Sequence, residues 1–300
     1  MAAKLPYKPT NEFTEEWVEY DGARFVTQSW KVPEGVKYRG KIIYVHGFCE
    51  TRDLYVEAFD KFTHHGYEVF FFEQRGAGDT SPGNEIGKTE EKYVFGDLDF
   101  FIKRNLDQRK DPAEKLILMG HSMGGAIVLN YGIKGTYREE FKAIVASAPL
   151  ILLHPLSEPH FIIKFVGSYL SKLLPRIHFP AGLQFDYMTS DPDWKNYIQN
   201  SGARFVTTLR QANDFFKRGE ALVDPEWVSN FSQDISVCVL HGDSDNINWD
   251  RGSERFMELL PEKTTKEFHH IDGGLHSMYM ERETVRVEFF EKVFLFLDSH

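Results

Sequence analysis

Short apolar runs alternate with helical patterns along most of this chain, and this rhythm limits the folds that it can adopt. Helical spacing of apolar residues is found at 54–65 and 93–106. The runs of strand length lie at 41–45, 67–73, 115–119, 142–148, 235–240 and 267–271. Continuous apolar strands are typical of parallel sheets, in which helices cover both faces. The alternation therefore predicts an α/β fold with a mostly parallel central sheet flanked by helices.

Two further strands are predicted ahead of this series, at 17–20 and 24–32. They flank the dipeptide Asp21-Gly22. Because a type I′ turn needs positive φ at both central residues, this dipeptide favours a tight hairpin.

The charge and the cysteine content of the chain exclude several classes of protein. The formal charge is −10, and no basic tract stands out, so we expect no nucleic-acid partner. Two cysteines in 300 residues do not indicate a disulfide framework. The N-terminus has no apolar segment of the kind found in signal peptides, and no stretch is long enough to span a membrane. We therefore expect a cytoplasmic location.

The strand–helix rhythm is interrupted between about residues 150 and 228. A helix is predicted at 161–174, ending at Pro175, and a second one at about 204–217. We interpret 150–228 as a helical cap inserted into a core formed by 1–149 and 229–300. The apolar face of its first helix would contact either the core or a ligand. Its position just past the end of a strand favours the ligand, because open α/β sheets bind ligands there.

The sequence Gly120-His-Ser-Met-Gly124 lies between a predicted strand and a predicted helix. A sharp turn at this junction projects the side chain of Ser122 away from the backbone, as in a nucleophile elbow. Glycine on both sides lets the strand and the helix approach without a clash between Cβ atoms. Ser122 is therefore the predicted nucleophile.

A serine hydroxyl needs a base and a carboxylate that orients the base. In α/β-hydrolases the chain order is serine, acid, histidine. Asp245 is the favoured acid, because it lies past the end of the strand 235–240, where a loop can turn toward a histidine. Asp243 is the main alternative, and either could instead cap a helix predicted at 249–260. His276 is the predicted base, since it follows two glycines in a loop.

An oxyanion hole requires backbone N–H groups near the nucleophile. The amides of Phe48, in the loop after the first parallel strand, and of Met123, after the serine, are the predicted donors. His46 and His121 are expected to support these loops through hydrogen bonds. Cys49 lies either near a substrate channel or at an inert position.

Five segments in combination resemble the monoacylglycerol lipases, especially those of fungi. The segments are His-Gly-Phe-Cys-Glu at 46–50, Gln-Arg-Gly-Ala-Gly-Asp-Thr-Ser-Pro-Gly at 74–83, Gly-His-Ser-Met-Gly-Gly at 120–125, Ser-Ala-Pro-Leu-Ile-Leu-Leu-His-Pro at 147–155 and His-Gly-Asp-Ser-Asp at 241–245. The resemblance implies an α/β-hydrolase whose lid docks peripherally on membranes or lipid droplets. It implies cleavage of monoacylglycerols to glycerol and fatty acid, and by motif it assigns Ser122, Asp245 and His276 as the catalytic triad.

The resemblance also implies that Glu50 lies near the end of the site that binds glycerol. The alternative is a salt bridge from Glu50 to Arg52 or Arg75 that stabilises the loop. Animal members of the family carry a second histidine past the base, where this chain has Tyr279; we leave Tyr279 out of the predicted site.

The predicted chemistry needs no metal and no organic cofactor. A carboxylesterase, lysophospholipase or acyltransferase of the same fold would share the same three residues. A lipid-binding module without catalytic activity is the alternative from another class, and the complete set of serine, acid and histidine argues against it.

Overall fold

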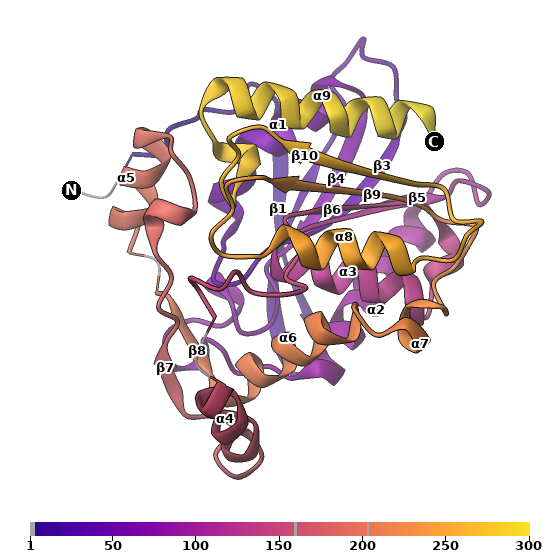
Figure 1. Ribbon diagram of the computed structural model, residues 1–300. Coiled ribbons are helices and arrows are strands. Elements are labelled where there is room, and N and C mark those ends of the chain that lie inside the picture. Colours follow the sequence, from indigo (N-terminus) through magenta and orange to yellow (C-terminus); the bar gives the residue numbers. More distant parts are fainter. Residues whose placement is uncertain (1–3, 159–160, 203) are drawn as a thin grey trace.

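The computed structural model describes residues 4–158, 161–202 and 204–300, and an eight-stranded sheet passes through its centre (Figure 1). The strand order is β1-β2-β4-β3-β5-β6-β9-β10. From β4 to β10 the neighbouring strands are parallel, whereas β2 is antiparallel to both β1 and β4. This confirms the predicted, mostly parallel sheet. The strands are β1 (Phe13–Tyr20), β2 (Ala23–Trp30), β3 (Gly40–Val45), β4 (Tyr67–Phe72), β5 (Leu116–His121), β6 (Phe141–Ser147), β9 (Ser236–Gly242) and β10 (Lys266–Ile271).

The turn between β1 and β2 is the predicted hairpin. Asp21 has a φ of 43° and Gly22 a φ of 73°, so both central residues have the positive φ of a type I′ turn.

Helices cover both faces of the sheet, as predicted. On one face lie α1 (Val56–His64) and α9 (Glu283–Ser299), and on the other lie α2 (Glu91–Gln108), α3 (Met123–Lys134) and α8 (Asp250–Leu259) (Figure 1). Side chains alternate between the two layers because successive residues of a strand point to opposite faces. The predicted helix at 54–65 is divided into a 3₁₀ turn, η1 (Arg52–Tyr55), and α1.

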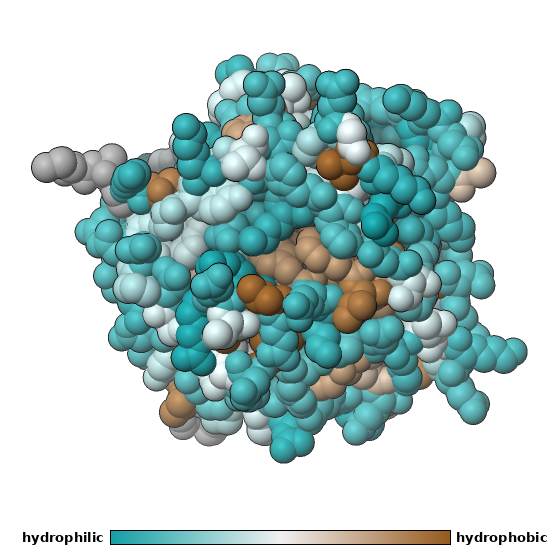
Figure 2. Space-filling model, turned by 90° about the horizontal axis from the view of Figure 1, so that it is seen from above, coloured by the Kyte–Doolittle hydropathy of each residue, from teal (hydrophilic) through white to brown (hydrophobic). Residues whose placement is uncertain are grey.

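The face seen from above in Figure 1, where α9 lies, is largely hydrophilic with an apolar area near its middle (Figure 2). Val287 and Leu295 of α9 are exposed, while Phe289 and Val293 are buried against the sheet. Within the described residues, no helix combines the length and the apolar character needed to cross a bilayer.

The segment between β6 and β9 departs from the regular alternation of strands and helices. It contains α4 (Phe161–Leu173), β7 (His178–Pro180), η5 (Phe185–Tyr187), α5 (Pro192–Asn200), β8 (Val206–Thr208), α6 (Leu209–Ala221) and α7 (Pro225–Val228). We call this segment, residues 150–228, the insertion. The side chains of 161–166 lie outside the described part of the structure.

Two features of the insertion differ from the prediction. The helix expected from about residue 204 begins only at Leu209, because the preceding residues form β8, which pairs with β7. Thr208 then caps the helix by accepting a hydrogen bond from the amide of Gln211 at 3.2 Å. Helix α5 was not predicted, although Asp191 caps it and proline follows at its first position.

Candidate active site

The carboxyl ends of β3, β5, β9 and β10 lie at one edge of the sheet, and the loops that leave them converge there. Ser122 lies at the tip of the turn from β5 into α3, with a φ of 53° and a ψ of −117°. Few residues with a side chain adopt this conformation, and such strain is concentrated at functional sites. The Ser122 amide donates to Ser147 O at 2.9 Å, and Ser122 O accepts from the Leu150 amide at 2.9 Å, which fixes the turn.

The flanking glycines are required by close backbone contacts. A Cβ atom on Gly120 would lie 2.4 Å from Gly124 O, and one on Gly124 would lie 2.1 Å from Val45 O. Real Cβ atoms do not approach backbone oxygens so closely. The end of β5 and the start of α3 therefore lie directly against each other, as the sequence predicted for this turn, and the end of β3 packs against the same helix start.

Asp245 and His276 form a buried pair. Asp245 Oδ2 lies 2.8 Å from His276 Nδ1. The other oxygen, Asp245 Oδ1, accepts hydrogen bonds from the amides of Ile247 at 2.8 Å and Asn248 at 3.0 Å. The alternative acid, Asp243, is exposed, and its Oδ1 instead accepts from the Gly273 amide at 2.9 Å. Asp245, and not Asp243, is the aspartate that contacts His276.

The electrostatics of this pair favour charge on both partners. Burial by itself raises the pKa of Asp245, but the neighbouring His276 and the hydrogen bonds from His241 and His276 hold that pKa well below its usual value. Burial lowers the pKa of His276, but the Asp245 carboxylate more than offsets this, so the net pKa is raised above 6.5. A histidine in this environment is well suited to accept a proton during a reaction.

The two predicted oxyanion donors come from two elements next to Ser122: Phe48 lines the same cavity as the serine, and Met123 follows it in the chain. Met123 is the first residue of α3, and Phe48 lies in the loop after β3. Within the described part of the chain, neither backbone amide donates a hydrogen bond to a protein group. Both amides are therefore available to a ligand, and the positive end of the α3 dipole lies beside them.

A cavity of about 220 Å³ opens beside Ser122, and Phe48, Glu50 and His276 line it as well. Most of its remaining wall is apolar and comes partly from the insertion, including Leu150, Leu153, Leu183, Met188, Phe215 and Ile247. A largely apolar cavity with a few polar side chains in its wall is typical of a site for a ligand with a long apolar part.

Cys49 lies outside the lining of this cavity. It has a φ of 58°, and its thiol contacts Val206 O in the insertion at 3.6 Å. Burial raises the pKa of this thiol to about 12, so it stays protonated. These features agree with the alternative of an inert residue.

Glu50 is buried, lines the cavity and holds the loop after β3. Its Oε2 accepts hydrogen bonds from the Gly47 amide at 2.6 Å and from the Tyr55 hydroxyl, and its Oε1 accepts from the Tyr279 hydroxyl at 3.2 Å. Burial raises the pKa of Glu50. The alternative of a salt bridge to an arginine is wrong, because Arg52 pairs with Glu73 and Arg75 with Asp97.

The two histidines expected to support the loops behave differently. His46 accepts from the Gln74 amide through Nε2 at 2.8 Å and donates through Nδ1 to Gly47 O at 2.7 Å, as predicted. Burial lowers the pKa of His46 to about 4, so the ring is neutral. His121 is also buried, but within the described residues neither of its ring nitrogens has a hydrogen-bond partner. Its Nε2 nevertheless lies 3.5 Å from Glu50 Oε1, so the ring contacts the loop after β3 without a hydrogen bond of ordinary geometry. The same ring lies 4.8 Å from that of His276.

Sequence reasoning missed two residues at this site. His241 is buried, and its Nε2 lies 3.3 Å from Asp245 Oδ2, so Asp245 lies between two histidines. The motif His-Gly-Asp-Ser-Asp contained this histidine, but no pattern marked it as a partner of the aspartate. Tyr279 lies outside the predicted site, yet its hydroxyl donates to Glu50 Oε1 at 3.2 Å.

A serine on a strand–helix turn and a buried Asp–His pair, at the carboxyl edge of a mostly parallel sheet, define a serine hydrolase of the α/β-hydrolase fold. The family described as serine aminopeptidase, S33 (Hydrolase_4) matches residues 36–283. A monoglyceride lipase of Saccharomyces cerevisiae is 35% identical over 99% of this chain and 97% of its own length. The chain belongs to the monoglyceride lipase family, within this group of hydrolases.

Solved structures agree with this assignment. The crystal structure of a soluble variant of the S. cerevisiae monoglyceride lipase, in complex with a substrate analog, has a TM-score of 0.94, 35% identity and 99% coverage of both chains. A thermostable carboxyl esterase from Bacillus coagulans, in complex with glycerol, has a TM-score of 0.78 at 21% identity, with 97% of this chain and 99% of the esterase covered. The second similarity concerns the fold alone. Together they confirm the predicted α/β-hydrolase fold.

Proposed function

We propose that this chain hydrolyses the ester bond of monoacylglycerols and releases glycerol and a fatty acid through an acyl-enzyme intermediate on Ser122. The observation that carries the proposal is the buried contact of 2.8 Å between Asp245 and His276, beside a cavity that His276 shares with Ser122. The substrate class is supported by the 35% identity to the yeast monoglyceride lipase.

In the first half of the proposed reaction, His276 Nε2 takes the hydroxyl proton of Ser122 while the serine oxygen attacks the ester carbonyl carbon. Asp245 holds the proton on Nδ1, which leaves Nε2 free to act as the base and stabilises the imidazolium that forms. The bond from the carbonyl carbon to the glycerol oxygen then breaks, and His276 returns its proton to that oxygen.

In the second half, water attacks the acyl-serine ester and transfers a proton to His276. The bond to the serine oxygen breaks, the proton returns to Ser122, and the fatty acid leaves. The amides of Phe48 and Met123 stabilise the negative oxygen in both halves. Each oxyanion donor in such a site contributes about 10²–10³-fold to the rate.

Glu50 supports binding of the glycerol end of the substrate in this proposal. Its Oε1 accepts a hydrogen bond from the Tyr279 hydroxyl, and Glu50 lines the same cavity as Ser122 and His276. A carboxyl group in this place can accept a hydrogen bond from a glycerol hydroxyl. The apolar wall then receives the acyl chain, and orients the ester between Ser122 and the two amides.

The insertion is the proposed cap, and it carries the proposed contact with a membrane or with a lipid droplet. Half of the large apolar side chains that are exposed among the described residues lie within it: Leu156, Tyr169, Leu173, Leu174, Ile177 and Phe179. Leu156 also lines the cavity, so the exposed surface and the cavity are continuous there. Apolar groups at the entrance bind a lipid surface by burial and bring the site to its substrate.

Two measurements test the catalytic proposal. Ser122→Ala should lose several orders of magnitude in the rate on monooleoylglycerol, with only about 10³–10⁴-fold acceleration over water left. A fluorophosphonate probe should label the parent chain and not the variant. Near-normal hydrolysis by the variant would refute Ser122 as the nucleophile. Failure to label the parent chain would instead favour a non-catalytic lipid-binding module.

A substrate panel tests the substrate class. We expect kcat/KM on monooleoylglycerol to exceed the values on short p-nitrophenyl esters and on lysophosphatidylcholine. Preference for a short ester would identify a carboxylesterase, and preference for the lysophospholipid would identify a lysophospholipase. Acyl transfer to an added alcohol in preference to water would identify an acyltransferase.

Vesicle binding tests the proposed lipid contact. Replacing Leu173 and Leu174 by aspartate should lower sedimentation with phosphatidylcholine vesicles and leave hydrolysis of a short soluble ester unchanged. Replacing Leu295 and Val287 on α9 by aspartate is the matched control, because their exposure is close to that of Leu173 and Leu174 but both lie outside the insertion. Equal losses in both variants would contradict the proposed surface.

A further inference from the structure

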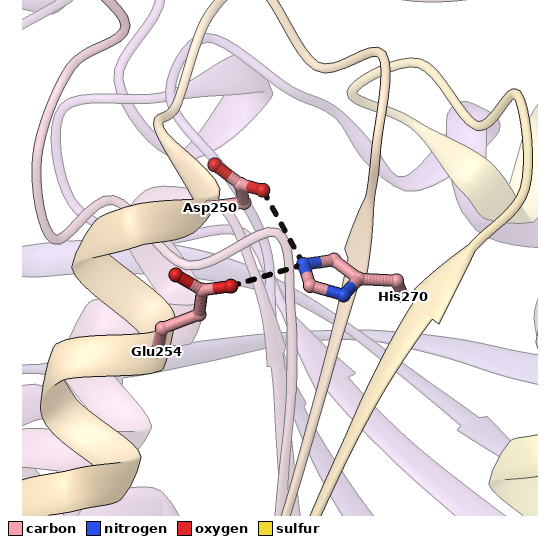
Figure 3. A group of neighbouring side chains, drawn as sticks. All are labelled: Asp250, Glu254 and His270. Carbon is pink, nitrogen blue, oxygen red and sulfur yellow. Dashed lines mark ion pairs between the residues drawn. The ribbon is translucent and has the colours of Figure 1, made fainter.

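Three side chains outside the cavity of Ser122 point toward one another at the surface of the core (Figure 3). Asp250 and Glu254 are four residues apart on α8, so they lie on the same side of the helix. His270 comes from the neighbouring strand β10. Its Nε2 lies 3.3 Å from Asp250 Oδ2 and 3.7 Å from Glu254 Oε1.

The donor set is of a kind that binds transition metals. One imidazole nitrogen and two carboxylate oxygens suit Zn²⁺ and similar divalent ions. At Zn–N and Zn–O distances of about 2.0–2.2 Å, tetrahedral ligand atoms lie about 3.3–3.6 Å apart. The two separations from His270 Nε2 are close to this range, and all three ligand atoms lie within 4.8 Å of one another. Small side-chain rotations are enough to bring them around one ion.

The two carboxylates of the group can both bind a divalent ion. Such a cation would lie between the oxygens of Asp250 and Glu254 and take the imidazole nitrogen of His270 as a third ligand. Glu254 is already oriented, because its second oxygen accepts from Arg251 at 2.8 Å and leaves Oε1 toward His270. Such partners in the outer shell strengthen metal binding.

We propose that Asp250, Glu254 and His270 form a surface site for a divalent transition metal, with Zn²⁺ as the preferred ion. Three protein ligands leave at least one position for water, and all three side chains are partly exposed, so the ion can enter directly from solution. The site takes no part in the ester chemistry.

An ion at this site would join the two elements that border the loops of Asp245 and His276. Asp250 follows Asp245 by five residues, and His270 precedes His276 by six. The metal would therefore connect the start of α8 with the end of β10, at the bases of the two loops that bring those residues together. Because only the folded chain presents the three ligands together, binding should stabilise the fold.

Isothermal titration of the full chain with ZnCl₂ tests this site, in a buffer that does not chelate zinc. The chain has 12 histidines, so the informative quantity is the difference between variants. We expect one binding site of the parent chain to be lost, or weakened at least tenfold, in both His270→Ala and Glu254→Gln. His269→Ala and Glu258→Gln are the matched controls, because they lie on the same two elements but outside the group.

Thermal unfolding gives a second measurement on the same proteins. At a Zn²⁺ concentration about 100 times the dissociation constant, the Tm of the parent chain should rise by about 5 °C, and that of the two variants should not. Circular dichroism verifies that the variants are folded. Identical zinc isotherms in the parent and in both variants would overturn the proposal. Tighter binding of Mg²⁺ than of Zn²⁺ would overturn the assignment of the ion.

Discussion

Replacing Asp245 by asparagine changes one atom at the centre of the proposed triad, and the structure indicates how the new amide would orient. Asp245 Oδ1 accepts hydrogen bonds from two backbone amides, those of Ile247 and Asn248. Because an NH₂ group cannot accept these bonds, the carbonyl oxygen of the asparagine must take this position. The NH₂ group is then left at the position of Oδ2, facing His276 Nδ1.

This orientation stabilises the wrong tautomer of His276. An NH₂ group donates to Nδ1, so Nδ1 must be the unprotonated nitrogen and the proton moves to Nε2. His276 then cannot accept the proton of Ser122. The same substitution in a serine protease, the worked case for this effect, lowers kcat by about 10⁴. At about 1.36 kcal/mol per tenfold change, that corresponds to roughly 5.4 kcal/mol of lost transition-state stabilisation.

The assay is the steady-state kcat on monooleoylglycerol, together with the rate of fluorophosphonate labelling. Asp243→Asn is the matched control, since Asp243 lies in the same loop but contacts Gly273 rather than His276. We expect it to keep the kcat of the parent chain within about threefold, as for surface substitutions away from the site. A kcat above a tenth of the parent value for Asp245→Asn would refute the reasoning, and so would equal losses in the two variants.

Three further predictions concern pH, the elbow and the insertion. Because the net pKa of His276 is raised, kcat/KM should fall on the acidic side with an apparent pKa above 6.5. Below that pH the imidazole is protonated and can no longer act as a base. A midpoint below 6.5 in a pH–rate profile would contradict this prediction. Gly124→Ala should lower the free energy of unfolding by about 1–3 kcal/mol, because the added Cβ would overlap a carbonyl oxygen of β3. Gly96→Ala, at an open position of α2, should raise that free energy by up to about 1 kcal/mol. Chemical denaturation measures both variants, and the opposite order of stability would contradict the packing. Removing the cap of α5 by Asp191→Ala should cost about 1 kcal/mol in the same assay, and no change would show that the cap is dispensable.

The sheet could be predicted from the sequence because its strands are buried on both faces. Residues such as Ile42 and Ile43 pack against opposite helical layers, so the whole run must be apolar. The hairpin turn at Asp21-Gly22 could also be predicted, because the positive φ of a type I′ turn depends on these two residues alone. The proximity of Asp245 and His276 followed from their positions after adjacent strands, which the chain order of the fold implies.

The insertion was harder to predict because its elements depend on one another. Strand β8 has only three residues and is defined by its pairing with β7, about 30 residues earlier in the chain, so no local pattern separates it from the start of α6. The role of His241 could not be predicted either, because it depends on a contact between residues that no local pattern marks. It lies within a buried strand, where a histidine gives no periodic signal, and only the fold places it against Asp245.

The positive φ of Ser122 sets the stability of the folded chain against its catalytic activity at this position. A side chain in this conformation costs about 1–3 kcal/mol, which the rest of the folded chain must offset. Folding alone would favour glycine at the tip of this turn, and only the chemistry requires a hydroxyl there. Selection for thermal stability and selection for turnover therefore act in opposite directions at this one residue. A stabilised chain should retain its elbow only if variants are screened for hydrolysis as well as for melting temperature.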